Sequence, residues 1–191
     1  MTITLPTAVV PEPIELADGL VRLRPYRADD VEPMYLAARE SLAEVSPWLV
    51  WCHADYGIDD SRGWVHSRER AWNASEEYSF VIVDAANGAP VGGCGLNKFD
   101  HINRRANLGY WTRTSQTGRG LATAAARLLA RWGFDRVGLT RIEIVAAVGN
   151  SASQRVAVKL GAVREGILRN RCFLADGPHD ALSYSLIPGD L

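Results

Sequence analysis

The sequence predicts a single domain of the α/β (α+β) class, built on one mixed central sheet of about seven strands with about four helices. Three observations lead to this prediction. The chain has 191 residues, 47% of them hydrophobic, which suffices for the core of one domain. Short apolar stretches of strand length alternate along it with longer stretches of helical periodicity. The chain contains neither an internal repeat nor a linker-like segment at which it would divide.

The stretches with the pattern of β-strands are residues 20–25, 78–83, 90–96, 104–111, 141–148, 166–174 and 181–187. In the first stretch Val21 and Leu23 alternate with arginines, as in a half-buried strand, and Pro25 ends it. Asn87-Gly88 is a strong hairpin signal between the next two. We therefore expect an antiparallel meander over residues 78–111 and a second hairpin at the end of the chain.

Helices are expected from Asp29 to about residue 38, over 59–72, after Gly120, and over 150–160. The apolar side of the third helix is predicted to consist of Leu121, Ala125, Leu128 and Trp132. In the fourth, Ser151 and Gln154 fit a capping box, and Gly161 is a natural C-terminal stop.

Residues 1–13 read as a flexible N-terminal arm, which leaves 14–191 as the domain. The arm has no basic region and no apolar run long enough for a signal or membrane segment. Cys52, Cys94 and Cys172 are odd in number and far apart, so we expect reduced thiols, a cytoplasmic protein and no metal site.

Charge is unevenly distributed along the chain. The first 100 residues carry 8 Lys/Arg and 16 Asp/Glu, whereas residues 101–136 carry seven arginines and one acid. This distribution suits an anionic ligand near residues 101–136 and a cationic partner for the first half. It gives no reason to expect direct binding of nucleic acid.

A glycine-rich loop in the basic region is the strongest functional signal. Gly118 and Gly120 allow the backbone to curl, so that several N–H groups and the N-terminus of the next helix point into one concavity. Such a site favours phosphate, and a strand ending at Thr112 leads into it. A P-loop would need Lys and Ser or Thr after the last glycine, and a dinucleotide-binding loop would need a third small residue where Thr123 stands.

The loop resembles the acetyl-coenzyme-A loop of the GNAT superfamily of N-acetyltransferases, Arg/Gln-x-x-Gly-x-Gly/Ala, with Gly120 and Ala122 at the two small positions. Thr117 stands at the Arg/Gln position, which is a departure from the pattern. Other stretches with a resemblance to the family are 22–25 with Asp29-Asp30, Gly109-Tyr110-Trp111, 150–153 and 159–162. Glu165-Gly166 followed by Arg169 resembles the Rim-type branch, which acetylates ribosomal-protein and other N-terminal amines.

The resemblance implies the GNAT acyl-CoA N-acyltransferase fold and acetyl-CoA as cofactor. Pantetheine is expected in a gap between the strand at 108–112 and the strand at 142–147, with a backbone N–H near Tyr110 and Trp111 facing the acetyl oxygen. The residues expected to bind the cofactor are Tyr110, Trp111, Thr112, Thr117, Gly118, Arg119, Gly120, Leu121, Ala122, Asn150 and Ser153.

Acetyl transfer needs a neutral amine and a protonated leaving thiolate. By resemblance, Glu165 is the candidate base, acting directly or through water, and a surface glutamate is the alternative. Relatives often carry a glutamate where this chain has Asn107. Many also carry a tyrosine near the sulfur at the position of Ala157, so Ser153 is the candidate donor to the thiolate. The alternative is that Ser153 only belongs to a helix start, with Asn150 or Ser151 as the cap.

Trp48 and Trp51 are expected to wall the acceptor site, because the segments between the first strands cover it throughout the superfamily. The leading hypothesis is an acetyl-CoA-dependent N-acetyltransferase that uses a protein N-terminal amine and transfers directly in a ternary complex. Alternatives are a small amine (antibiotic, polyamine or amino acid) as acceptor, or a non-catalytic acyl-CoA-binding domain. A homodimer is possible, and no membrane partner is expected.

Overall fold

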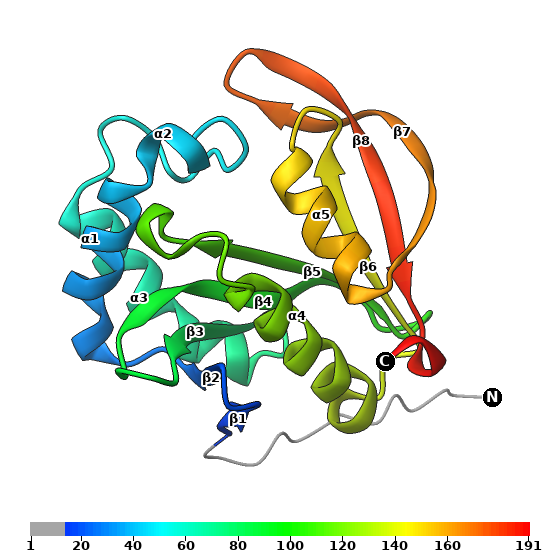
Figure 1. Cartoon of the computed structure of the whole chain (residues 1–191), viewed down its shortest axis with the longest axis horizontal. Coiled ribbons are helices and arrows are strands. Elements are labelled where there is room, and N and C mark those ends of the chain that lie inside the picture. The colour runs from blue at the N-terminus through cyan, green and yellow to red at the C-terminus, as the bar shows by residue number, and fades with distance from the viewer. Residues whose placement is uncertain (1–13) are drawn as a thin grey trace.

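The computed structural model of the chain describes residues 14–191. In this part of the chain eight strands form one mixed sheet in the order β1-β2-β3-β4-β5-β6-β8-β7 (Figure 1). The strands are β1 (Leu16–Ala17), β2 (Val21–Pro25), β3 (Tyr78–Asp84), β4 (Pro90–Asp100), β5 (Arg105–Thr112), β6 (Arg141–Ala147), β7 (Val163–Leu174) and β8 (Gly177–Leu186).

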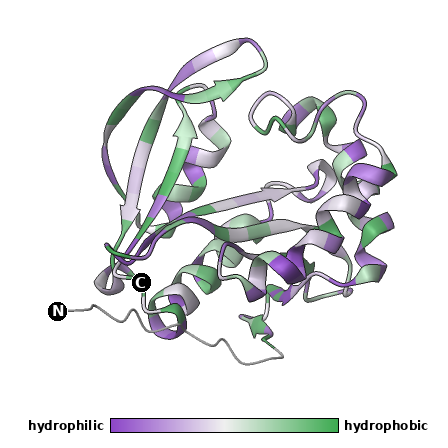
Figure 2. Cartoon of the chain, turned by 180° about the vertical axis from the view of Figure 1, so that it is seen from behind, coloured by the Kyte–Doolittle hydropathy of each residue, from purple (hydrophilic) through white to green (hydrophobic). Residues whose placement is uncertain are grey.

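Helices cover both faces of the sheet. They are α1 (Val31–Glu40), α2 (Leu42–Val45), α3 (Ile58–Asn73), α4 (Leu121–Trp132) and α5 (Ser151–Leu160), with a π-helical turn after α4 (Gly133–Val137). Figure 1 shows α4 and α5 on the near side of the sheet, with α3 behind it, and Figure 2 gives the view from behind.

The main core lies between the sheet and α4 with α5. Phe80, Leu108 and Ile144 from the strands and Leu129 and Leu160 from the helices are all almost fully buried there. They come from every second strand residue and from one side of each helix, which is the pattern that the sequence carries. A smaller cluster of Met34, Val81 and Val83 packs on the other face, under α1.

The sheet divides between β5 and β6, its only parallel pair within residues 14–191. These strands pair only at Arg105–Arg141, Ala106–Ile142 and Asn107–Glu143. Beyond that point β5 stays paired with β4 as far as Thr112, while β6 stays paired with β8 as far as Ala147. The two halves of the sheet therefore open into a V, as Figure 1 shows.

The predicted fold class and element order are confirmed, with small differences in the counts. The two-residue strand β1 and the single-turn helix α2 were not predicted from the sequence. The capping box at Ser151 is wrong, because Asn150 is the N-cap of α5 and its side chain accepts the N–H of Ser153. Gly161 ends that helix in the left-handed conformation, as expected. The predicted arm, residues 1–13, lies outside the described residues.

Candidate active site

The glycine loop lies at the open end of β5 and runs directly into α4. Gly118 and Gly120 have φ angles of +78° and +81°, which L-residues with a side chain rarely adopt, and Gly120 is the N-cap of α4. No hydrogen bond within residues 14–191 engages the backbone N–H groups of Gly118, Arg119 or Gly120. Together with the helix N-terminus they provide free donors and partial positive charge, as an anionic group requires.

The segment before this loop is fastened to α1. The Glu40 carboxylate accepts the N–H of Ser115 at 2.8 Å and pairs with the Arg113 guanidinium. The hydroxyl of Ser41 accepts the N–H of Thr114 at 3.0 Å. Hydrogen bonds from Arg113 and Ser115 lower the pKa of Glu40 to about 2. The loop is thus held in place by a carboxylate that stays ionised at neutral pH.

Arg119 projects from the loop toward the end of β3. Its Nη1 lies 2.7 Å from Oδ2 of Asp84, whose side chain is only 2% exposed, and it also contacts Gln116. The pKa of Asp84 is lowered, first by the N–H of Ala86 and then by Arg119. The Arg119 side chain remains 42% exposed, so its positive charge stays beside the free N–H groups of the loop. Thr117 donates its hydroxyl to the Thr114 carbonyl at 2.9 Å.

Tyr110 and Ser153 connect β5 to α5 across the V. The Tyr110 hydroxyl donates to the Ser153 carbonyl at 3.0 Å and lies 3.1 Å from the Ser153 Oγ. Ser153 is also fixed from the other side, because its N–H donates to Asn150 Oδ1 at 3.0 Å. Burial raises the pKa of Tyr110 to about 12, so its proton stays on the oxygen at neutral pH. Two hydroxyls therefore meet at the inner side of the V.

Glu165 lies at the closed end of the V. Arg141 binds its carboxylate with both terminal nitrogens, and Ser185 Oγ donates to it at 2.9 Å. The hydrogen bond from Arg141 lowers the pKa of Glu165. Arg141 also binds Glu143 at 2.9 Å, so the charges connect β6 to β7. Glu165 is thus a charged carboxylate whose oxygens are already occupied, which is a poor starting point for a base.

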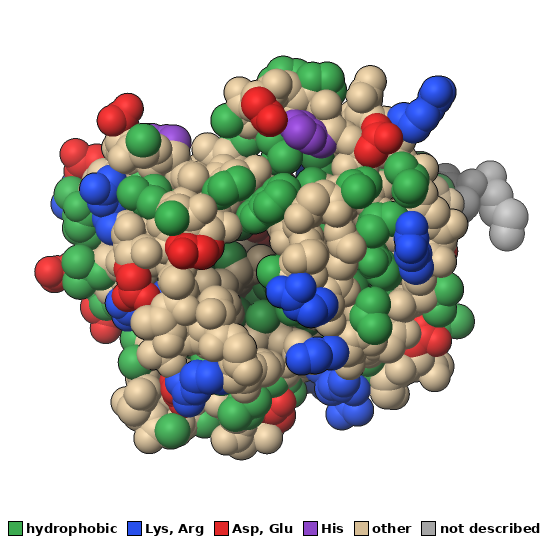
Figure 3. Space-filling view, turned by 45° about the horizontal axis from the view of Figure 1, so that its top comes forward, with side chains coloured by type: hydrophobic (Ala, Val, Ile, Leu, Met, Phe, Trp, Pro, Cys, Tyr) green, Lys and Arg blue, Asp and Glu red, His purple; other side chains and the backbone are tan. Residues whose placement is uncertain are grey.

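Aromatic side chains line the other face of the sheet at the open end of the V. Trp51 packs edge-on against Trp111 with ring centroids 5.2 Å apart. A Cβ on Gly149 would lie 3.1 Å from Cη2 of Trp48, so the missing side chain gives the indole its place against the β6–α5 turn. Trp48 and Trp51 therefore approach the two arms of the V from one segment, and Figure 3 shows the surface hollowed between the two halves.

The same face contains residues that the sequence reasoning missed. A Cβ on Gly93 of β4 would lie 2.5 Å from the Tyr26 hydroxyl and 3.1 Å from Trp111 Nε1. Both polar atoms therefore pack directly against the backbone of β4. Gly95 pairs with Gly109 on β5, so the two strands contribute no side chain at these positions and neighbouring side chains pack close to the backbone. The run Gly92-Gly93-Cys94-Gly95 was a signal for such close packing.

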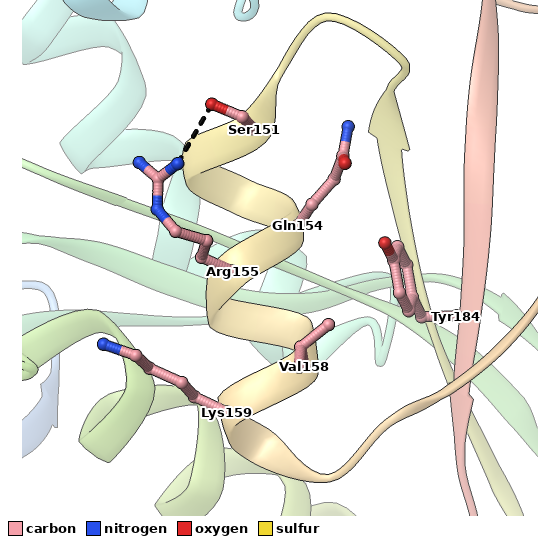
Figure 4. Close-up of a pocket in the computed structure, with 6 residues that line it drawn as sticks. All are labelled: Ser151, Gln154, Arg155, Val158, Lys159 and Tyr184. Atoms are coloured by element: carbon pink, nitrogen blue, oxygen red, sulfur yellow. Dashed lines mark hydrogen bonds between the residues drawn. The ribbon is translucent and has the colours of Figure 1, made fainter.

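A separate shallow pocket of about 340 Å³ lies along α5 (Figure 4). Its lining residues are Ser151, Gln154, Arg155, Val158, Lys159 and Tyr184. None of them belongs to the predicted site.

Across residues 14–191 there is no cluster of acidic, histidine or cysteine side chains that could hold a metal ion. None of the helices described is both long and apolar enough to cross a membrane.

Comparison with known proteins agrees with this geometry. The sequence model of the acetyltransferase (GNAT) domain family matches residues 21–163. YdaF of Bacillus subtilis (strain 168), whose name describes it provisionally as a ribosomal N-acetyltransferase, is 37% identical over 101 residues, covering 53% of this chain and 55% of YdaF. The match thus spans about half the length of that relative.

Two further proteins are similar over nearly the whole chain. The ribosomal-protein-serine acetyltransferase of Escherichia coli (strain K12) is 25% identical over 92% of this chain and 97% of its own. The structure of Mycobacterium smegmatis RimJ in complex with CoA-disulfide has a TM-score of 0.83 and 25% identity, covering 94% of this chain and 87% of RimJ. The splayed sheet, the glycine loop and the family match agree: the chain belongs to the GNAT acetyltransferase domain family.

Proposed function

We propose that the chain is an acetyl-CoA-dependent N-acetyltransferase that acetylates the N-terminal amine of a protein, ribosomal proteins being the class suggested by its relatives. The observation that carries the proposal is the V between β5 and β6. At the open end of the V, the glycine loop before α4 lies on one side, and the aromatic side chains Trp51 and Trp111 lie on the other. A cofactor and an acceptor can therefore enter from opposite faces and meet in the gap.

On the cofactor side, the pyrophosphate would rest on the N–H groups of residues 118–122 and the N-terminus of α4. Pantetheine would extend along the free edge of β5, whose backbone groups beyond Asn107 have no partner on β6. A backbone N–H near Tyr110 and Trp111 would face the acetyl oxygen. Acetyl-CoA supplies the activated thioester, and the protein supplies placement and proton handling.

The Tyr110–Ser153 pair is our candidate for stabilising the leaving thiolate. The single proton of the Tyr110 hydroxyl is donated to the Ser153 carbonyl and holds α5 against β5, so the Ser153 hydroxyl beside it is the group that can turn to donate to sulfur. Glu165 stays our candidate base only if the acceptor displaces Arg141 from its carboxylate. An N-terminal amine has an ordinary pKa of about 7.7–8.0, so a large share is neutral without any base near pH 8.

On the acceptor side, Trp48 and Trp51 wall an approach to the V, and Gly93 of β4 lies buried beneath Tyr26 and Trp111. An open approach suits a chain terminus better than a small enclosed amine. The protein acceptor, a homodimer and a cytoplasmic location are parts of the same proposal.

The test is a mass-spectrometric assay of the purified chain with acetyl-CoA. The acceptors are a peptide with a free N-terminus, the same peptide with a blocked N-terminus and one lysine, and a set of polyamines, amino acids and antibiotics. We expect acetylation of the free N-terminus and little of the blocked peptide. Preferential acetylation of a small amine would replace the protein acceptor, and cofactor binding without any transfer would favour a binding domain.

A further inference from the structure

The outer edge of the sheet carries a cationic surface whose arginines have no ion-pair partner within residues 14–191. β7 pairs only with β8, so it is an edge strand, and nearly all of its residues are exposed. Its arginines, Arg164, Arg169 and Arg171, form no ion pair with any residue of the described chain, 14–191. The acid on the same strand, Glu165, is already occupied by Arg141. The edge strand therefore carries a net positive charge.

A bulge in β7 concentrates two of these arginines. Leu168 pairs with Ala181 and Cys172 with His179, so three residues of β7 stand opposite the single residue Asp180. Asn170, in the middle, has a φ angle of +50°, and its N–H donates to Asp180 Oδ1 at 2.9 Å. The Asp180 carboxylate thus holds the backbone of the bulge, and its single charge offsets only part of the charge of the two arginines.

The bulge is continuous with the mouth of the V. Asp180, opposite the bulge, accepts the N–H of Val148 through its carbonyl at 3.0 Å. Val148 precedes Gly149, against which Trp48 lies. A chain that leaves the aromatic wall can therefore pass directly onto the bulge, and Figure 1 shows the β7–β8 hairpin on the opposite side of the gap from α2.

Two other occupants fit less well. A second copy pairing β7 against β7 would bring the arginines of both strands together, and like charges on neighbouring strands are unfavourable. Continuous strand addition is also hindered, because the bulge interrupts the row of backbone groups at residues 169–171. Single-stranded nucleic acid would match the arginines and could stack on Phe173, which is 76% exposed, so the continuity of the edge with the mouth of the V is what favours a segment of the acceptor.

We propose that this outer edge, residues 167–173, docks an acidic segment of the acceptor protein that follows the N-terminus undergoing acetylation. The proposal rests on the proposed function and narrows its substrate class to proteins whose first segment is acidic. The arginines supply attraction and orientation, and Ile167 and Phe173 supply apolar contact. Because the contacts lie outside the transfer site, they change capture of the acceptor and leave the chemical step unchanged.

The test compares two peptides of about 20 residues with the same first six residues, one continuing with alternating Glu and Gly and the other with alternating Gln and Gly. Transfer from acetyl-CoA is measured for the wild type, for R169E/R171E, and for the control R131E/R136E. The control makes the same charge change at exposed positions at the far end of α4 and in the turn after it.

We expect the wild type to prefer the acidic peptide by about fivefold or more in kcat/KM, mainly through KM, and to lose the preference in 0.5 M salt. R169E/R171E should lose the preference while its activity on the neutral peptide stays within about twofold, and R131E/R136E should keep it. Equal kcat/KM for both peptides in the wild type, or a preference that survives R169E/R171E, would overturn the proposal. The arginines would then serve to prevent pairing of the edge strand β7 with another chain.

A binding measurement separates this proposal from the proposed function. Fluorescence anisotropy with the N-acetylated acidic peptide, which cannot react, should show binding that weakens in R169E/R171E. Such binding without transfer to the unblocked peptide would refute the proposed function and would still support the docking surface. Binding of a single-stranded oligonucleotide that depends on Arg169 and Arg171, with no binding of the acidic peptide, would assign the surface to nucleic acid and refute the inference.

Discussion

Replacing Gly120 by valine tests the glycine loop in isolation from packing. The φ angle of Gly120 is +81°, and a Cβ there would meet only Leu20 Cδ2, at 3.9 Å. Space is therefore available, and the cost of valine is the left-handed backbone itself, about 1–2 kcal/mol or more for a β-branched residue. If the loop relaxes to escape this cost, its N–H groups turn away from the phosphate position. We expect the Kd for acetyl-CoA to rise at least tenfold, which corresponds to about 1.4 kcal/mol.

The assay is titration calorimetry of acetyl-CoA with folded protein, and Gly138→Val is the matched control. Gly138 has a φ angle of +79° and no atom near its Cβ position, so valine there carries the same backbone strain. It lies after the turn that follows α4, away from the loop. Both variants should lose similar stability in thermal melts, but only Gly120→Val should lose affinity. Unchanged affinity in folded Gly120→Val, or equal losses in both variants, would refute the phosphate-binding role of the loop.

Three further predictions follow from single contacts. Glu165→Gln should lower kcat roughly 10²-fold with little change in acetyl-CoA affinity if Glu165 is the base; a kcat near that of the wild type from pH 6 to 9 would show that the amine loses its proton elsewhere. Ser153→Ala should slow turnover with little change in the melting temperature, whereas a loss of stability alone would make Ser153 only part of a helix start. Glu40 has its pKa lowered to about 2, so its stabilising contribution is present above pH 4.5 and is lost as pH falls toward 2. At neutral pH Glu40→Gln should therefore cost about 0.5–1 kcal/mol in urea unfolding, a difference from the wild type that shrinks in acid; a constant difference would contradict this.

The fold could be predicted because its signals are local. The alternation around Val21 and Leu23, the Asn87-Gly88 turn and the glycines of the loop each depend on neighbouring residues, and each appears where the sequence placed it. The opening between β5 and β6 is not local. It was expected only through the family resemblance, because no residue pattern in β5 or β6 indicates the position at which the two strands stop pairing.

The partners of charged residues were beyond sequence reasoning. Arg119 pairs with Asp84, 35 residues away, and Arg141 with Glu165, 24 residues away. Both contacts change the chemical interpretation of the residue: Arg119 is held beside the loop, and Glu165 is charged and occupied. The sequence left Asn150 or Ser151 as the cap of α5, and the structure shows that the Asn150 side chain is the one that caps the helix.

The central claim is that the V between β5 and β6 brings acetyl-CoA and a peptide N-terminus together for direct transfer. The most direct measurement is tandem mass spectrometry of a peptide with a free N-terminus and an internal lysine after incubation with acetyl-CoA and the chain. The account predicts acetyl on the N-terminal nitrogen, at a rate that rises with pH through about 7.7–8.0 as that amine becomes neutral. Acetyl-CoA binding with no acetylated peptide, or acetyl found only on lysine, would contradict it.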